Sequence, residues 1–208
     1  MAEKPRGRPR AYDPERALEA ALSVFWQKGY AGTSLDALAE ATGMNRPSLY
    51  AGLGDKQTIY LKAMTLFQTQ AQAHFAAALQ PQPEDQSFAD VICRYLHAAL
   101  ALEGQHEASN LCGCAVISTA TAEALTDPLI RQALNDVLAR IDQQLLNSLK
   151  MAQADGRLDA AVDVSALAFL LAATMQSIGL RARAGFANEA IAPMIKSLAH
   201  TLCPPPLR

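Results

Sequence analysis

Residues 29–56 read GYAGTSLDALAEATGMNRPSLYAGLGDK, and two short helices are predicted from this stretch. The first begins at Thr33, because threonine is a good N-cap residue and Asp36, three residues later, completes a variant of the capping box. It ends near Ala41, before the turn formed by Thr42, Gly43 and Met44. Both ends of the first helix are therefore marked in the sequence.

A second short helix follows after a turn of three residues. Asn45 can cap it, and Pro47 is tolerated because proline is harmless in the first turn of a helix. It ends at about Gly52. Two short helices joined by a turn that contains glycine meet the description of a helix-turn-helix, here over about residues 33–52, whose second helix enters the major groove of DNA.

The side chains of the second helix favour a nucleic-acid role over a plain helical hairpin. Leu49 and Leu53 can face the core, while the other side of the helix is polar. Its polar groups can reach base edges or phosphate oxygens, and they are Asn45, Arg46, Ser48 and Tyr50. For Arg46 a base contact and a phosphate contact are equally open, because arginine makes both.

The sequence on either side of this stretch is also helical. Asp13 and Pro14 mark the start of a preceding helix that stops at Gly29, and Asp55 caps a long helix after the motif. Further helices are predicted at residues 87–102, 114–124, 128–153, 163–184 and 188–202. The fold class is therefore all-α with about nine helices, organised as a basic arm over 1–12, a DNA-binding domain over 13–56 and a helical body over 57–208.

Composition limits how this chain can bind DNA. Of its 208 residues, 50% are hydrophobic and 18% charged, with a formal net charge of −2. This composition excludes a disordered chain and a uniformly basic nucleic-acid binder, so positive charge has to be local. It is concentrated in the arm, where the run PRGRPR at residues 5–10 resembles the core of an AT-hook, with Arg6, Arg8 and Arg10 entering a narrow minor groove. The alternative is a basic tail that raises only non-specific affinity.

The order and spacing of several runs resemble the DNA-binding headpiece of the TetR family of bacterial transcriptional regulators. These runs are GYAGTSL at 29–35, AEATG at 39–43, PSLY at 47–50 and GDK at 54–56, and the resemblance covers roughly residues 13–67. Leu53 departs from the family pattern, which has an aromatic residue there. The resemblance implies a dimeric regulator, most often a repressor, that binds a palindromic DNA operator and is released by a small effector.

The resemblance also implies roles for particular residues. Phosphate contacts are carried over to Thr33, Ser34, Tyr50 and Lys56, and the groove-facing start of the recognition helix to Asn45, Arg46, Pro47 and Ser48. The last two helices resemble those through which family members form homodimers. No catalytic residue, cofactor or metal is implied.

The effector pocket is expected in the helices after Asp55. Its expected lining consists of apolar or weakly polar side chains, namely Phe67, Phe75, His97, Cys114, Phe169 and Met175. Because charge is scarce there, an apolar or weakly polar ligand is expected. Residues 164–180 are uncharged but fall short of the roughly 20 apolar residues of a membrane-spanning helix, so a buried helix, no membrane association and a cytoplasmic setting are expected.

The pair Cys112 and Cys114 leaves other functions open. Metal binding would need more ligands, and only His97 and His106 lie near in sequence. A redox-sensing regulator would need a thiol with a lowered pKa, and a cysteine-dependent enzyme would need an ordered base beside the thiol. The remaining alternatives are an architectural DNA-binding protein without an effector and two cysteines that are simply small buried residues.

Overall fold

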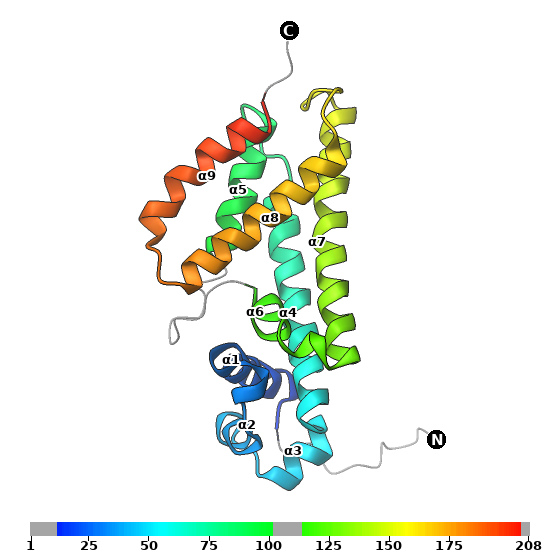
Figure 1. The fold of residues 1–208 in the computed structure, drawn as a ribbon, viewed down its shortest axis with the longest axis vertical. Helices are drawn as coiled ribbons and strands as arrows, with labels where there is room; N and C mark the ends of the chain where they lie inside the picture. The colour runs from blue at the N-terminus through cyan, green and yellow to red at the C-terminus, as the bar shows by residue number, and fades with distance from the viewer. Residues whose placement is uncertain (1–11, 102–113, 205–208) are drawn as a thin grey trace, which may run out of the picture. The chain divides into compact units, whose positions relative to one another are not determined.

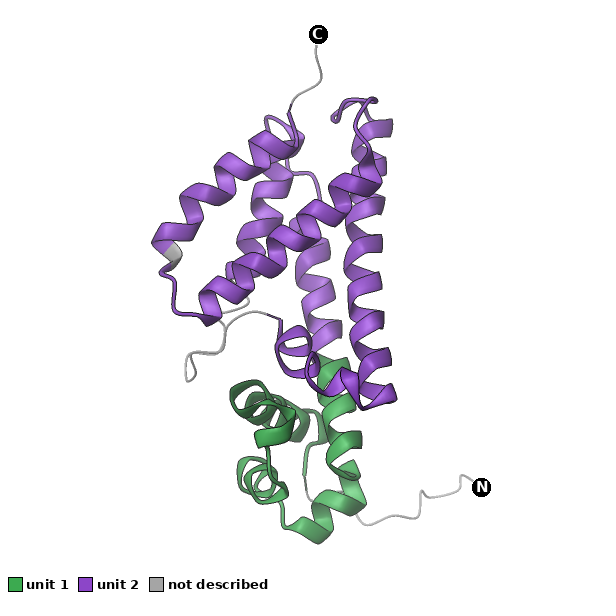
Figure 2. Cartoon of the chain, viewed as in Figure 1, with its two compact units in different colours: residues 1–66 green, residues 67–208 purple. Residues whose placement is uncertain are grey.

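The computed structural model describes residues 12–101 and 114–204, and within these ranges it contains nine α-helices, one short 3-10 helix and no strand (Figure 1). The all-α fold class is confirmed. The chain divides into two compact units, an N-terminal unit over Met1–Leu66 and a C-terminal unit over Phe67–Arg208 (Figure 2). The division falls inside one long helix, α4, whose first residue, Lys56, lies at the domain boundary expected from the sequence.

The N-terminal unit contains α1 (Pro14–Gly32), α2 (Leu35–Thr42), α3 (Arg46–Leu53) and the start of α4 (Lys56–Ala78). The Asp13 carboxylate caps α1 and accepts a hydrogen bond from the backbone N–H of Glu15 at 3.0 Å. Gly29, the expected end of this helix, has a φ of 72° and kinks the chain, which then makes one more turn to Gly32. At Gly29, where the sequence predicts the end of the helix, the structure therefore shows a kink.

Three aromatic rings join α1 to α4 in the core of the N-terminal unit. The ring of Tyr60 on α4 meets Phe25 at a centroid distance of 5.1 Å and Tyr30 at 5.0 Å, edge to face in both cases. Phe25 and Tyr60 are fully buried. Edge-to-face pairs add to the burial of apolar area, so this cluster fixes the start of α4 against α1.

The C-terminal unit contains the rest of α4 and six further elements, which are α5 (Phe88–Ala101), α6 (Ala115–Ala120), η1 (Glu123–Leu125), α7 (Pro128–Ala154), α8 (Val164–Arg183) and α9 (Asn188–Leu202). The prediction of a single helix over residues 114–124 is wrong, because this segment forms two separate elements, α6 and η1. The hydroxyls of Thr119 and Thr121 donate to carbonyls one turn back, at Ala115 and Ile117. Such bonds compete with the helical ladder and bend or end helices.

The core of the C-terminal unit lies between α5, α7, α8 and α9. Tyr95 of α5 is buried in it and donates a hydrogen bond from its hydroxyl to the Sδ of Met175 on α8 at 3.1 Å. Helix α8 passes a length and composition test for a membrane span, as core helices of soluble proteins also do. One of its faces is packed in this core through Leu167, Leu171 and Ile178, whereas Phe169 and Leu180 are exposed, so the expected burial holds for only part of the helix.

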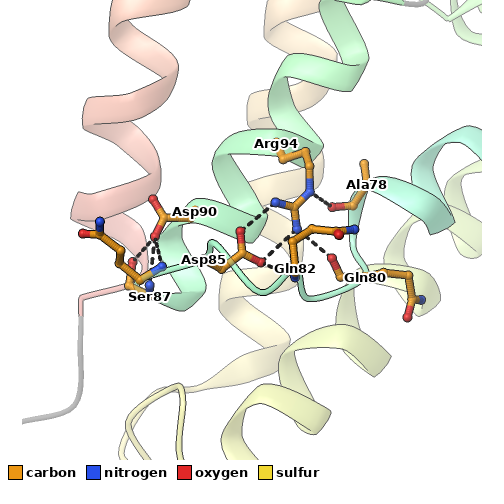
Figure 3. A network of polar contacts seen from close by, with 8 residues as sticks. Ala78, Gln80, Gln82, Asp85, Ser87, Asp90 and Arg94 are labelled. Carbon is orange, nitrogen blue, oxygen red and sulfur yellow. Dashed lines mark hydrogen bonds and ion pairs between the residues drawn. The ribbon is translucent and has the colours of Figure 1, made fainter.

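An ion-pair network holds the loop between α4 and α5 (Figure 3). The guanidinium of Arg94 donates to the carboxylate of Asp85 at 2.7 Å and to the carbonyl oxygens of Ala78 at 3.0 Å and Gln80 at 2.6 Å. The hydrogen bond from Arg94 lowers the pKa of the Asp85 carboxyl. One arginine therefore satisfies the end of α4 and fixes the entry into α5.

We expect Arg94→Met to lower the free energy of unfolding by about 2 kcal/mol, because it leaves a mostly buried carboxylate and two carbonyls without their donor. In the wild type the folded pKa of Asp85 lies below its unfolded value, so this contribution is complete above about pH 5 and is lost as the pH falls through the folded pKa. Denaturant unfolding at pH 7 and pH 3 measures both effects. Lys150→Met, which removes an exposed charge from α7, is the control, and equal losses in the two variants would contradict the role of Arg94.

Candidate functional site

Helix α2 begins one residue later than the sequence indicates. Ser34 is its N-cap, and its Oγ accepts a hydrogen bond from the backbone N–H of Ala37 at 3.1 Å. The prediction that Thr33 caps α2 is therefore wrong. Thr33 is 2% exposed and its hydroxyl donates to the carbonyl of Gly29 at 2.7 Å. Its hydroxyl thus braces the kink of α1, and the exposed hydroxyl at the start of α2 is that of Ser34.

The turn between α2 and α3 depends on Gly43, which has a left-handed φ of 66°. The N–H of Met44 donates to the carbonyl of Ala39 at 3.0 Å and the N–H of Gly43 donates to that of Glu40 at 3.2 Å. This is the hydrogen-bond pattern of a Schellman motif, and Met44, the residue after the glycine, is buried as that motif favours. Helix α2 therefore ends at Thr42, one residue after the predicted end near Ala41, and Gly43 lies in the turn as predicted.

Helix α3 has one buried and one exposed side. Asn45 caps it as predicted, with its Oδ1 accepting from the N–H of Ser48 at 2.9 Å. Leu49 and Leu53 are buried, whereas Tyr50 is 50% exposed. The predicted groove-facing residues Asn45, Arg46, Pro47 and Ser48 are all exposed and form the first turn of the helix. Leu53 fills the core position that the sequence assigns to it.

Arg46 does not project freely from this surface. Its Nε donates to Oδ1 of Asp36 at 2.6 Å and its Nη2 donates to Oδ2 at 2.5 Å. Asp36 was predicted to belong to a capping box, and the structure instead pairs it with an arginine ten residues later. The hydrogen bond from Arg46 lowers the pKa of the Asp36 carboxyl, which therefore stays ionised at neutral pH.

Lys56 begins α4 beside an aromatic ring. Its Nζ lies 4.5 Å from the centroid of Tyr30, within the range of a cation–π contact. Asp55 caps the helix as predicted and accepts from the N–H of Thr58 at 2.8 Å. Lys62, one turn and a half further on, donates from its Nζ to the carbonyl of Leu53 at 2.8 Å and so satisfies the end of α3.

A close contact at Gly52 connects the start of the described chain to α3. The hydroxyl of Tyr12 lies only 2.2 Å from where a Cβ at Gly52 would stand. Tyr12 therefore packs on the backbone of α3, and a Cβ at position 52 would have room only if the Tyr12 ring moved. Arg6, Arg8 and Arg10 of the arm lie outside the described residues.

The C-terminal unit holds a cavity of about 320 Å³. Four of the six residues predicted for a pocket line it, namely Phe67, Phe75, Cys114 and Met175; its other described lining residues are Ala99, Ile117, Ser118, Thr121, Gln176, Gly179, Leu180 and Arg183. The other two predicted residues, His97 and Phe169, do not belong to the described lining of this cavity. Phe169 is 69% exposed, whereas Met175 on the same helix is 5% exposed.

The cysteines in the described residues are thiols that favour the protonated form. Burial raises the pKa of Cys93, Cys114 and Cys203. Cys112 and His106 lie outside the described residues. Within residues 12–101 and 114–204, no group of three or more His, Cys, Asp or Glu side chains could hold a metal ion.

Helices α8 and α9 contact each other and leave an apolar surface uncovered. Phe169 and Leu180 on α8 are 69% and 67% exposed, and Met194 and Leu198 on α9 are also exposed. Their spacing places them along one stripe on each helix. We refer to these four residues as the α8–α9 face, of which Leu180 also belongs to the lining of the cavity.

Comparison with known proteins gives a match over most of the chain. Residues 17–63 match the family model described as bacterial regulatory proteins, tetR family, and residues 88–198 match that described as tetracyclin repressor-like, C-terminal domain. The chain is 30% identical over 186 residues to the HTH-type transcriptional repressor ComR of Escherichia coli K12, covering 89% of this chain and 87% of ComR. The HTH-type transcriptional repressor BdcR of the same organism is 40% identical over 58 residues, which is 28% of this chain and 29% of BdcR.

A solved structure of the TetR family transcriptional regulator CifR is also similar. That structure is of a cysteine mutant in complex with a 26-base-pair operator DNA, and it superimposes with a TM-score of 0.81 at 28% identity over 93% of this chain and 98% of that chain. The family resemblance stated from the sequence is thereby confirmed.

We expect Gly52→Ala to destabilise the N-terminal unit by about 1–3 kcal/mol, because the added methyl group overlaps the Tyr12 hydroxyl. Thermal unfolding measures the loss. Gly32→Ala is the matched control, since its Cβ would meet only the Lys28 side chain at an ordinary 3.7 Å. The double variant Tyr12→Ala, Gly52→Ala should show no further loss from the second change, and additive losses would contradict the contact.

Proposed function

The chain belongs to the TetR family of bacterial transcriptional regulators, and we propose that it is a repressor that binds a palindromic operator as a homodimer and is released by a small, largely apolar effector. The observation that carries this proposal is the two-sided α3, which buries Leu49 and Leu53 while it exposes the polar residues of its first turn. A helix of this kind at the end of a helix-turn-helix can enter a major groove.

The residues on and around α3 fall into two groups, one suited to contacts with bases and one suited to contacts with phosphates. Asn45, Arg46, Pro47 and Ser48 stand at the start of the helix that would face the bases. Ser34, Tyr50 and Lys56 surround it with hydroxyl and ammonium groups suited to phosphate oxygens. Thr33 supports the kink behind this surface through its bond to Gly29. The basic arm adds Arg6, Arg8 and Arg10 for an adjacent minor groove.

Dimerisation would cover the α8–α9 face. Several large apolar side chains are left exposed on these two helices, and large exposed apolar surface is typical of interaction sites. A second copy of the chain suits this surface, because a two-fold dimer presents two recognition helices to half-sites about one DNA turn, roughly 34 Å, apart. This assignment also accounts for Phe169, which the pocket does not use.

The cavity in the C-terminal unit is the proposed effector site. Most of its described lining is apolar, with phenylalanine, methionine, isoleucine and leucine as the large side chains, while Ser118, Thr121 and Gln176 are polar and Arg183 is the charged residue. Helix α4 carries Lys56 at its start and the cavity residues Phe67 and Phe75 further along, so it belongs to both sites. A ligand that binds better to one arrangement of α4 would shift the population away from the DNA-binding form.

The other candidate functions have less support. Redox sensing and cysteine catalysis both need a thiolate, and burial raises the pKa of Cys114 and so favours the protonated thiol. We therefore assign no enzymatic activity to the chain. An architectural protein without an effector would have no use for the cavity. A DNA-binding regulator of this family works in the cytoplasm, where its operator lies.

We expect Phe169→Glu to convert the dimer into a monomer and to weaken operator binding at least tenfold, because two carboxylates would be buried across the two-fold axis. Sedimentation at micromolar concentration and operator titration measure the two effects. Met151→Glu, at an exposed apolar position on α7, is the matched control and should change neither. A wild-type chain that sediments as a monomer would overturn the proposed dimer.

A further inference from the structure

The side-chain pair Asp36–Arg46 joins α2 to α3 on the surface proposed to face DNA. The carboxylate accepts two hydrogen bonds from the guanidinium, from Nε at 2.6 Å and from Nη2 at 2.5 Å. The side chains of Arg46 and Asp36 are 57% and 71% exposed, so the pair is not part of the core. It therefore lies exposed at the start of α3, where a contact with DNA is proposed.

We propose that Asp36 is a positioning residue that holds Arg46 for the readout of one guanine in each half-site of the operator. This inference deepens the proposed DNA-binding function and rests on it. It assigns a specificity role to a residue of α2 that the sequence pattern marks only as part of a capping box.

The geometry of the guanidinium carries the inference. Arginine has five N–H donors in a rigid plane, and Asp36 uses the edge formed by Nε and Nη2. The edge formed by Nη1 and the second N–H of Nη2 remains available in the same plane. That edge can make the paired contact to O6 and N7 of guanine, which is the most common specific contact of arginine in the major groove.

Fixing the arginine in advance also lowers the cost of the contact. A free arginine side chain loses rotamer freedom when it binds a base, and a side chain whose guanidinium is already held loses less. Asp36 therefore contributes through Arg46 and need not touch the DNA itself. Two hydrogen bonds fix both the direction and the plane of the guanidinium, whereas one bond would leave it free to rotate.

The charge of the pair favours a base contact over a phosphate contact. Asp36 is ionised at neutral pH, and the hydrogen bond from Arg46 lowers its pKa further, so the two side chains together carry no net charge. Such a pair gains little from the general attraction of cations to phosphates, and the adjacent carboxylate repels a phosphate that approaches. The sequence leaves a base contact and a phosphate contact equally open for Arg46, and the charge of the pair favours the base contact.

The test uses the full chain and duplex DNA selected from a random pool by the wild type. Selection yields the operator, and each base of a half-site is then replaced in turn while binding of the wild type, Asp36→Ala and Arg46→Ala is titrated. We expect both variants to lose discrimination at the same single guanine, by roughly 5- to 150-fold. The double variant should lose no more than either single variant.

The matched control is Glu40→Ala, which removes an exposed carboxylate of α2 that has no contact with Arg46. This variant should keep the guanine preference, which separates positioning from a change in net charge. Thermal unfolding of Asp36→Ala should match that of the wild type, because both members of the pair are exposed. Asp36→Glu should recover part of the preference, since it restores a carboxylate.

Asp36→Ala that keeps the wild-type guanine preference would overturn the inference, as would uniformly tighter binding to every sequence with the preference unchanged. Loss of discrimination at different positions in the two variants would overturn it as well. If the wild type enriches no sequence, the proposed DNA-binding function fails first, and that result differs from one in which an operator is found and only Asp36 has no effect on it.

Discussion

The left-handed turn at Gly43 is the constraint on which the DNA-facing surface depends. It ends α2, returns two backbone N–H groups to carbonyls of that helix and brings Met44 into the core. Asn45 can then begin α3 in a register that buries Leu49 and Leu53. A residue with a side chain is strained at this φ, so the orientation of α3 rests on a position where glycine is favoured.

The DNA-facing surface that this turn positions consists of a few individually placed polar groups. The chain has a net charge of −2, and even the arginine at the start of α3 is paired with a carboxylate. Such a surface offers little attraction to DNA in general. Affinity has to come from the fit of α3, from the phosphate-facing side chains around it and from the basic arm, which together favour selective over general binding.

Local signals in the sequence predict the elements well. The aspartates at 13 and 55 mark the starts of two helices and the glycine at 43 marks the end of a third, and the structure shows all three signals in use. Asp127 and Asp163 cap α7 and α8 in the same way. Where the sequence misleads, tertiary contacts decide. Thr33 and Ser34 are equally good caps until Thr33 is buried under the kink of α1. The pair of Asp36 and Arg46 follows no helical spacing, and an almost wholly apolar α8 does not reveal that Phe169 points outward.

The central claim is that two copies of this chain hold two recognition helices on one operator. A hydroxyl-radical footprint of the full chain on its selected operator tests this claim most directly. The account predicts two protected regions related by two-fold symmetry, about one DNA turn apart, which are lost together when a compound that fills the cavity is added. A single protected region, or two regions that respond separately to that compound, would contradict it.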